Sequence, residues 1–227
     1  MRIQARPEPV DLEPARTAML VIDMQNAFGS PGGMFDRAGV PIASIQQAVA
    51  PTRAAIAAAR QAGLKIIYLK MGFQADLSDL GTNGGAQEHF FAHMGILDGV
   101  LTRDEWGSDI LDELTPAPDD TVVYKTRFSG FYQTELDELL RAAGIRHLIV
   151  TGCTTSICVE STVRDAFFRD YHCIVLEDCT AEPLGANLSR SNHDATLLLV
   201  ERVFGSVSTA ADLINLSTLD GQVIASR

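Results

Sequence analysis

Apolar stretches of strand length alternate along this chain with longer segments in which apolar residues recur with helical periodicity. Continuous apolar runs such as LIV at 148–150 and CIVL at 173–176 are typical of parallel strands that are buried on both faces. The expected strands are Ala18–Met24, Lys65–Met71, Thr121–Lys125, His147–Thr151, His172–Glu177 and a short strand at Gly205–Ser208.

Helical periodicity fills most of the intervals between these strands. The first three helices are each expected to end beside a residue at which the chain can turn, namely Gly63, Gly144 and Asp170. The expected helices are Ile42–Ala62, Tyr132–Ala143, Ser156–Arg169 and Leu188–Val203. Because strands alternate with crossover helices, the pattern predicts a three-layer α/β/α sandwich built on a parallel sheet.

Two segments interrupt this alternation. Gly29–Val40 is a glycine-rich loop after the first strand, whereas Gly72–Asp109 is longer and mixes polar, aromatic and glycine residues. Loops this long inside a domain are usually functional. We therefore expect Gly72–Asp109 to form a pocket wall or lid, with a short helix around Gln87–Met94.

Composition and charge narrow the range of functions. The chain has 227 residues, of which 46% are hydrophobic and 21% charged, and it contains no linker-like segment or repeat. We therefore expect one globular domain spanning residues 1–227. A net charge of −11 without a basic cluster argues against nucleic acid as a partner. No apolar stretch has the length of a membrane span and no signal peptide is evident, so we expect a cytoplasmic protein that has no membrane partner.

Candidate chemistry lies at the expected carboxyl ends of the strands, where open parallel sheets bind their ligands. Asp23 closes the first strand, Lys125 closes the third, and TGCTTSICVEST follows the fourth and leads into a helix. Cys158 in this segment is expected in the first turn of that helix, where the helix dipole and a neighbouring lysine would favour a thiolate. The small residues Thr154–Ser156 can bring backbone amides together to bind an oxyanion.

Each of these residues also has an ordinary structural interpretation. A cysteine in an apolar context is usually inert core, and Cys153, Cys173 and Cys179 keep that interpretation. An aspartate after a strand often caps a turn, and a lysine at a strand end usually points to solvent. The combination is more specific, because a carboxylate at Asp23 could take the thiol proton and return it to a leaving amine.

Three segments give the chain a family resemblance. VIDMQNAF, YKTRFSGF and TGCTTSICVESTVRDAF resemble the segments that carry the Asp, Lys and Cys of the isochorismatase-like cysteine hydrolases. The resemblance implies a Rossmann-like six-stranded parallel sheet of order 3-2-1-4-5-6, with Asp23 as base, Lys125 as electrostatic partner and Cys158 as nucleophile. It also implies a cis peptide between Cys153 and Thr154, an oxyanion hole made by the backbone amides of Thr154 and Cys158, and no cofactor.

Within that family the chain is similar to ureidoacrylate amidohydrolases through ARPEP, RFSGF, GIRHL and CVEST. It is similar to biuret hydrolases and N-carbamoylsarcosine amidases through GFQADLSDL and VFGSVS. The resemblance implies cleavage of a C–N bond in a small ureido, carbamoyl or amide compound through a thioester intermediate. It also implies a homo-oligomer, a dimer or tetramer, in which Ala210–Leu219 could pack on a neighbouring copy.

The expected pocket differs from those of the similar enzymes. Met71 and Phe73 stand where the ureidoacrylate enzymes have an amide and a tryptophan, and Phe128 stands where they have a tyrosine. These differences predict a less polar pocket. We expect its lining to include Phe28, Met71, Phe73, Phe128 and Trp106.

The sequence also bears on three other functions. A nicotinamidase-like metal site needs a histidine after the second strand, which KMGFQADLSDL lacks; His89 and His93 are spaced as on one helix face but lack a third ligand, so no metal is expected. Vinyl-ether hydrolysis of the isochorismatase type is an alternative, although Cys158 favours amide cleavage. A non-catalytic binding protein on a hydrolase fold is another alternative, against which the joint presence of Asp23, Lys125 and Cys158 argues.

Overall fold

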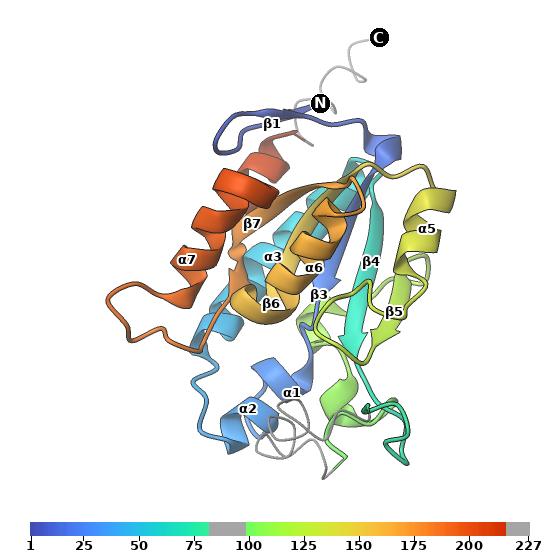
Figure 1. Ribbon diagram of the computed structural model, residues 1–227, viewed down its shortest axis with the longest axis vertical. Helices are drawn as coiled ribbons and strands as arrows, with labels where there is room; N and C mark the ends of the chain where they lie inside the picture. The colour runs from blue at the N-terminus through green and yellow to red at the C-terminus, as the bar shows by residue number, and fades with distance from the viewer. Residues whose placement is uncertain (82–98, 217–227) are drawn as a thin grey trace.

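The computed structural model describes residues 1–81 and 99–216 of the chain, and its centre is a parallel sheet of six strands (Figure 1). In space the strands follow the order β5-β4-β3-β6-β7-β8. Counted along the chain, this is the order 3-2-1-4-5-6, so the expected fold class is confirmed. The strands are β3 (Thr17–Ile22), β4 (Lys65–Met71), β5 (Thr121–Lys125), β6 (His147–Cys153), β7 (His172–Ala181) and β8 (Gly205–Ser208).

Helices cover both faces of this sheet. The long helix α3 (Ala43–Gln61) packs on one face, and α5 (Leu136–Ala142), α6 (Glu160–Phe167) and α7 (Asn192–Leu199) lie on the other (Figure 1). The shorter elements are β1 (Arg2–Ile3), β2 (Val10–Asp11), α1 (Asn26–Gly29), α2 (Met34–Arg37), and the 3-10 turns η1 (Pro14–Arg16), η3 (Trp106–Ser108) and η4 (Asp112–Leu114). The chain therefore forms the expected three layers.

Two helices, α5 and α7, begin later than their periodicity suggests, and side-chain hydrogen bonds hold the turns that precede them. The Thr134 hydroxyl donates to the Gly130 carbonyl and accepts from the Leu136 amide, so α5 starts at Leu136 rather than at Tyr132. The Ser191 hydroxyl caps α7 by accepting from the Asp194 amide. Both effects follow from the ability of small hydroxylated residues to satisfy unpaired backbone groups at helix starts.

Two helices contain a wider, π-type turn. The turn η5 (Thr155–Val159) precedes α6, and η6 (Val200–Phe204) follows α7. The helix expected from Ser156 is therefore a π turn followed by an α-helix. Such turns are rare, and they occur often at functional sites.

The core is built around the central strand β3, in which all six residues are buried. Burying an aliphatic side chain of this kind contributes on the order of 1.5–3 kcal/mol, so this apolar run strongly fixes the position of the strand. Its neighbour β6 approaches closely at Gly152, which pairs with Ile22 and has a φ of +121°. This close approach holds β3, which leads to Asp23, against β6, which leads to the segment that carries Cys158.

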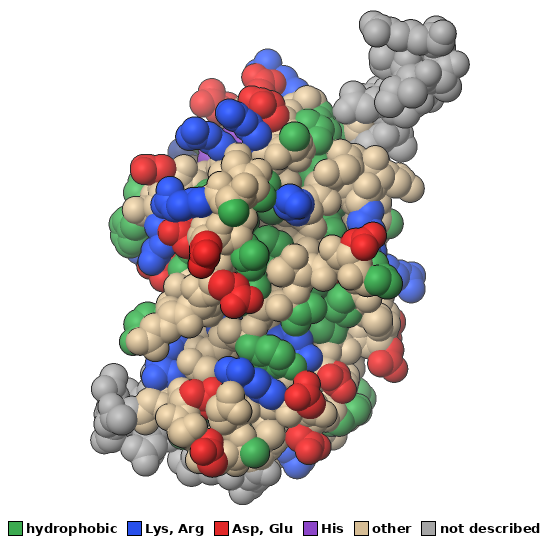
Figure 2. All heavy atoms as spheres, turned by 90° about the vertical axis from the view of Figure 1, so that its right-hand side faces the viewer, with side chains coloured by type: hydrophobic (Ala, Val, Ile, Leu, Met, Phe, Trp, Pro, Cys, Tyr) green, Lys and Arg blue, Asp and Glu red, His purple; other side chains and the backbone are tan. Residues whose placement is uncertain are grey.

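Charged side chains lie mixed on the surface. On the side of β5 and α5, acidic and basic groups are interspersed rather than gathered by sign (Figure 2). Among the described residues, every helix is too short or too polar to cross a membrane.

We predict that Gly152→Ala lowers the free energy of unfolding by about 2–4 kcal/mol, because a Cβ atom at this left-handed position would lie 2.0 Å from the Ile22 carbonyl oxygen. Gly144→Ala is the matched control, since Gly144 also has a positive φ but open space around it, and should cost about 1 kcal/mol. Denaturant unfolding measures both variants. Equal losses would show that the close approach of β3 and β6 does not constrain the sheet.

Candidate active site

Three side chains that are distant in sequence meet beyond the carboxyl ends of the central strands. Asp23 follows β3 directly, Lys125 ends β5, and Cys158 lies in η5 after β6. Lys125 Nζ donates to Asp23 Oδ2 at 2.7 Å, and the Cys158 thiol interacts with both charged groups. The exposed fractions are 1% for Asp23, 1% for Lys125 and 7% for Cys158. The three groups therefore form one buried cluster.

The backbone at Asp23 leaves the sheet in a left-handed conformation. The strand β3 ends at Ile22, so Asp23 is the first residue beyond it. Asp23 has a φ of +52°. The Asp23 amide still donates to the Leu69 carbonyl at 2.9 Å, so the residue remains attached to β4. Aspartate tolerates this conformation better than most residues. The turn directs the carboxylate over the ends of the strands.

Gln25, which the sequence did not single out, fixes the carboxylate from the side. The Met71 amide donates both to Asp23 Oδ1 at 3.1 Å and to Gln25 Oε1 at 2.8 Å. Gln25 Nε2 donates in turn to the carbonyls of Met71 at 2.9 Å and Ser108 at 2.8 Å. The only signal in the sequence was a polar residue two positions after Asp23, just beyond the apolar run of the strand.

Lys125 reaches Asp23 across an intervening strand. β4 lies between β3 and β5, and neighbouring strands are separated by about 4.8 Å, so a long side chain is needed to span the distance. Lys125 Nζ also donates to the Arg127 carbonyl at 3.2 Å. Two acceptors thus hold the ammonium group inside the protein.

The segment after β6 presents Cys158 from an anchored turn. The peptide bond between Cys153 and Thr154 is cis. Glu182, which is buried and follows β7, accepts hydrogen bonds from the amide and hydroxyl of Ser156. Thr155 Oγ1 lies 2.9 Å from His193 Nδ1. Glu182 and His193 were also missed, because their contacts join segments that are 26 and 38 residues apart in sequence.

The electrostatics of Cys158 differ from the expectation of a thiolate. Burial raises the pKa of the thiol most strongly, the positive charge of Lys125 lowers it, and the negative charge of Asp23 raises it again, so the net change is an increase. The loss of hydration therefore raises the pKa by more than the charge of Lys125 and the helix dipole lower it. In the resting site, Cys158 is a neutral thiol that needs a base.

Asp23 is suited to accept that proton. Burial raises the pKa of its carboxyl above the ordinary value, while Lys125, Cys158 and the Met71 amide act in the opposite direction. Burial lowers the pKa of Lys125, but the negative charge of Asp23 and the interaction with Cys158 more than offset this, so the pKa of the ammonium is raised and it stays protonated. Asp23 is therefore a stronger base than an exposed aspartate, beside a permanent positive charge.

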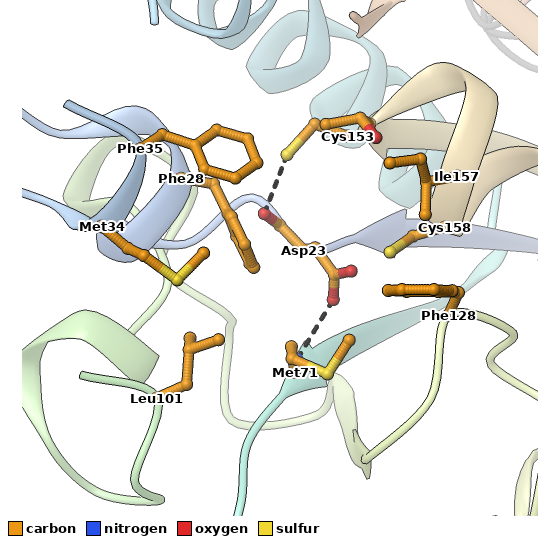
Figure 3. A pocket seen from close by; sticks show the side chains of 11 residues that line it. Asp23, Phe28, Met34, Phe35, Met71, Leu101, Phe128, Cys153, Ile157 and Cys158 are labelled. Carbon is orange, nitrogen blue, oxygen red and sulfur yellow. Dashed lines mark hydrogen bonds between the residues drawn. The ribbon is translucent and has the colours of Figure 1, made fainter. Parts of the chain in front are cut away.

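A small pocket, with a cavity volume of about 30 Å³, opens onto this cluster (Figure 3). Of the residues expected to line it, Phe28, Met71 and Phe128 do so. Two expectations need correction. Phe73 is fully buried and bridges to Thr102 in the core, and Trp106 has 53% of its surface exposed outside the pocket. The complete lining consists of Asp23, Phe28, Met34, Phe35, Met71, Leu101, Phe128, Cys153, Thr154, Ile157 and Cys158.

Aromatic and sulfur-containing side chains make up most of the lining of this pocket. Phe28 and Phe35 pack edge to face, with ring centroids 5.1 Å apart. Cys153 also faces the pocket and donates from its thiol to the Asp23 carbonyl at 3.1 Å (Figure 3). Its pKa is raised well above the ordinary value by burial. Cys153 therefore helps to hold Asp23 while remaining a neutral thiol.

Residues 1–81 and 99–216 contain no group of three or more His, Cys, Asp or Glu side chains that could hold a metal ion. The histidine pair His89 and His93 and the helix expected at Gln87–Met94 lie outside the described residues, as does the end of Ala210–Leu219.

Comparisons with known proteins agree with this geometry. The isochorismatase domain model matches residues 17–212. Ureidoacrylate amidohydrolase RutB of Caulobacter segnis is 41% identical over 217 residues, covering 92% of this chain and 89% of that protein.

Solved structures share the fold. A cysteine hydrolase from Pseudomonas syringae superimposes with a TM-score of 0.79 at 30% identity, covering 96% of this chain and 98% of that one. N-carbamoylsarcosine amidase from Thermoplasma acidophilum superimposes with a TM-score of 0.64 at 28% identity, covering 86% of this chain and 96% of that one.

We predict that Cys158 yields no thiolate absorbance in the ultraviolet until the pH exceeds the ordinary cysteine pKa of about 8.5, because burial and Asp23 both raise the pKa of the thiol. The signal is the difference between the wild type and Cys158→Ser during a pH titration. In Asp23→Asn, the thiolate absorbance of Cys158 should appear at lower pH, since a negative charge is removed and Lys125 remains.

Cys173 provides the control for this titration. It is buried in β7, and burial raises its pKa to about 12, so the difference between the wild type and Cys173→Ser should not respond to Asp23→Asn. A Cys158 thiolate already present at neutral pH would contradict the description of a neutral resting thiol.

Proposed function

The chain belongs to the isochorismatase family, and we propose that it is a cysteine-dependent amidohydrolase that cleaves the C–N bond of a small ureido, carbamoyl or amide compound. One observation carries the proposal: the buried thiol of Cys158 interacts with the Asp23 carboxylate, which is itself hydrogen-bonded to the Lys125 ammonium. Relatives named ureidoacrylate amidohydrolase and N-carbamoylsarcosine amidase support amide or ureide cleavage as the class of reaction.

Bond formation begins with proton transfer. The Cys158 sulfur attacks the substrate carbonyl carbon while Asp23 takes the thiol proton, so an S–C bond forms and the carbonyl oxygen becomes an oxyanion. Lys125 keeps its proton and stabilises the negative charge that develops on the sulfur. We assign the oxyanion to the backbone amides of Thr154 and Cys158, because both residues border the pocket on the turn that carries the sulfur.

Bond cleavage reverses the proton transfer. As the tetrahedral intermediate collapses, Asp23 returns the proton to the leaving nitrogen, the C–N bond breaks, and an acyl or carbamoyl thioester stays on Cys158. A water molecule then attacks the thioester carbonyl while Asp23 accepts its proton. The C–S bond breaks, the sulfur regains a proton, and the second product leaves.

The positions of the three groups favour amide cleavage over the alternatives considered from the sequence. Vinyl-ether hydrolysis has no need for a thiol beside a buried base. A binding protein has no need for a buried ion pair at its ligand pocket, since burying two charges costs free energy unless they gain strong partners. The arrangement is therefore best explained as machinery for covalent catalysis.

We predict that Cys158→Ala reduces kcat/KM at least about a thousandfold toward the best substrate, because the group that forms the thioester is lost. The measurement is ammonia release across ureidoacrylate, biuret, triuret, N-carbamoyl amino acids, nicotinamide and isochorismate. Cys173→Ala removes a buried thiol that does not border the pocket and should keep kcat/KM close to that of the wild type. If Cys158→Ala retained full activity, the proposed function would be wrong.

A further inference from the structure

The pocket beside Cys158 is mostly apolar where it is not formed by the reacting groups. Phe28, Phe35 and Phe128 contribute aromatic rings to its wall, and Figure 3 shows them arranged around the Asp23 carboxylate and the Cys158 sulfur. Four aliphatic or thioether side chains complete this wall: Met34, Met71, Leu101 and Ile157. Cys153 and Thr154 also line the pocket, and the buried Thr154 hydroxyl has no hydrogen-bond partner. A substituent that enters with the reacting group is therefore surrounded mainly by carbon and sulfur, and the lining formed by the described residues contains no charged side chain other than Asp23.

Lys125 lies behind Asp23 and is committed to the catalytic cluster, and the lining formed by the described residues contains no lysine or arginine. Lys125 Nζ is held by Asp23 at 2.7 Å and by the Arg127 carbonyl at 3.2 Å. Because Lys125 compensates the buried charge of Asp23, it cannot also neutralise a second carboxylate without leaving one of the two anions unpaired.

Other cations near the ends of β4 and β5 are bound elsewhere. Lys70 pairs with Asp109 at 3.6 Å, and Arg103 pairs with Asp79 at 3.2 Å. Arg127 donates to the backbone carbonyls of Asp79 and Thr126. The intervening sequence 82–98 contains no lysine or arginine.

From this environment we infer that the substrate is an uncharged ureide or primary amide with an apolar substituent, and that the pocket discriminates against a carboxylate on that substituent. The inference rests on the proposed function and names its substrate class. Its physical basis is desolvation: an anion that enters a mostly apolar pocket loses its hydration, and the lining formed by the described residues offers it no cationic partner in return. Ureidoacrylate, which gives its name to the relatives' activity, carries such a carboxylate.

The test uses three ureides that differ only at one end, namely 3-ureidoacrylate, its neutral amide 3-ureidoacrylamide, and N-propenylurea. The amide has nearly the same shape as the acid, so the pair separates charge from size. We expect kcat/KM to be highest for N-propenylurea and at least about 100-fold lower for the carboxylate. Every rate is corrected for the rate of Cys158→Ala.

A variant adds a cation at the edge of the pocket. Ile157 is half-buried there, so the long side chain of Ile157→Arg can reach the pocket while its stem packs on apolar surface. We expect this variant to reduce the preference for the neutral amide over the acid at least about tenfold. Val203→Arg is the matched control, because Val203 is also β-branched but is exposed on η6 outside the pocket. In this control, the ratio of kcat/KM for the amide to kcat/KM for the acid should equal that of the wild type.

The outcomes separate the inference from the proposed function. If 3-ureidoacrylate were cleaved as fast as its amide, or faster, and Cys158 were required, the inference about the substrate would be overturned and the proposed function would stand. If no ureide or amide were cleaved in a Cys158-dependent manner, both would fall. If the preference for the amide over the acid fell equally in Ile157→Arg and Val203→Arg, the inference would also be overturned, since the effect would then come from net charge.

Discussion

The ion pair between Asp23 and Lys125 is the interaction on which the rest of the site depends. Two charges in the interior lose most of their hydration, and their mutual attraction offsets this cost only when the geometry is close and the remaining hydrogen-bonding capacity is satisfied. Both conditions are met, because the pair is 2.7 Å apart, the Met71 amide donates to Asp23, and Lys125 donates to a second acceptor. The sheet supplies this geometry by placing β4 between the two residues.

The same burial determines the state of Cys158. A thiol at the start of a helix and near a lysine would ordinarily have a lowered pKa, but here burial raises the pKa, and Asp23 raises it further. A neutral thiol beside a strengthened base is suited to transfer its proton only when a carbonyl is present to receive the sulfur. The apolar wall around the cluster maintains this state, since it keeps the charges poorly hydrated.

Much of the fold and the core of the site could be predicted from the sequence, because they depend on local pattern and on the rule that ligands bind at the carboxyl ends of parallel strands. Asp23 and Lys125 were found in this way. What was missed depends on contacts across the fold. Gln25 acts through Met71 and Ser108, and Glu182 holds the Cys158 turn from the end of another strand. The direction of the Cys158 pKa was also wrong in the sequence interpretation, since the degree of burial is a tertiary property.

The proposal that Asp23 activates Cys158 for covalent catalysis is tested most directly by trapping the intermediate. Wild-type protein and Asp23→Asn are mixed with the best substrate, quenched with acid within one turnover, and examined by intact and peptide mass spectrometry. The account predicts an acyl or carbamoyl adduct on Cys158 in the wild type, and strongly slowed formation of that adduct in Asp23→Asn. Turnover without any adduct on Cys158, or an adduct that forms equally fast in Asp23→Asn, would contradict it.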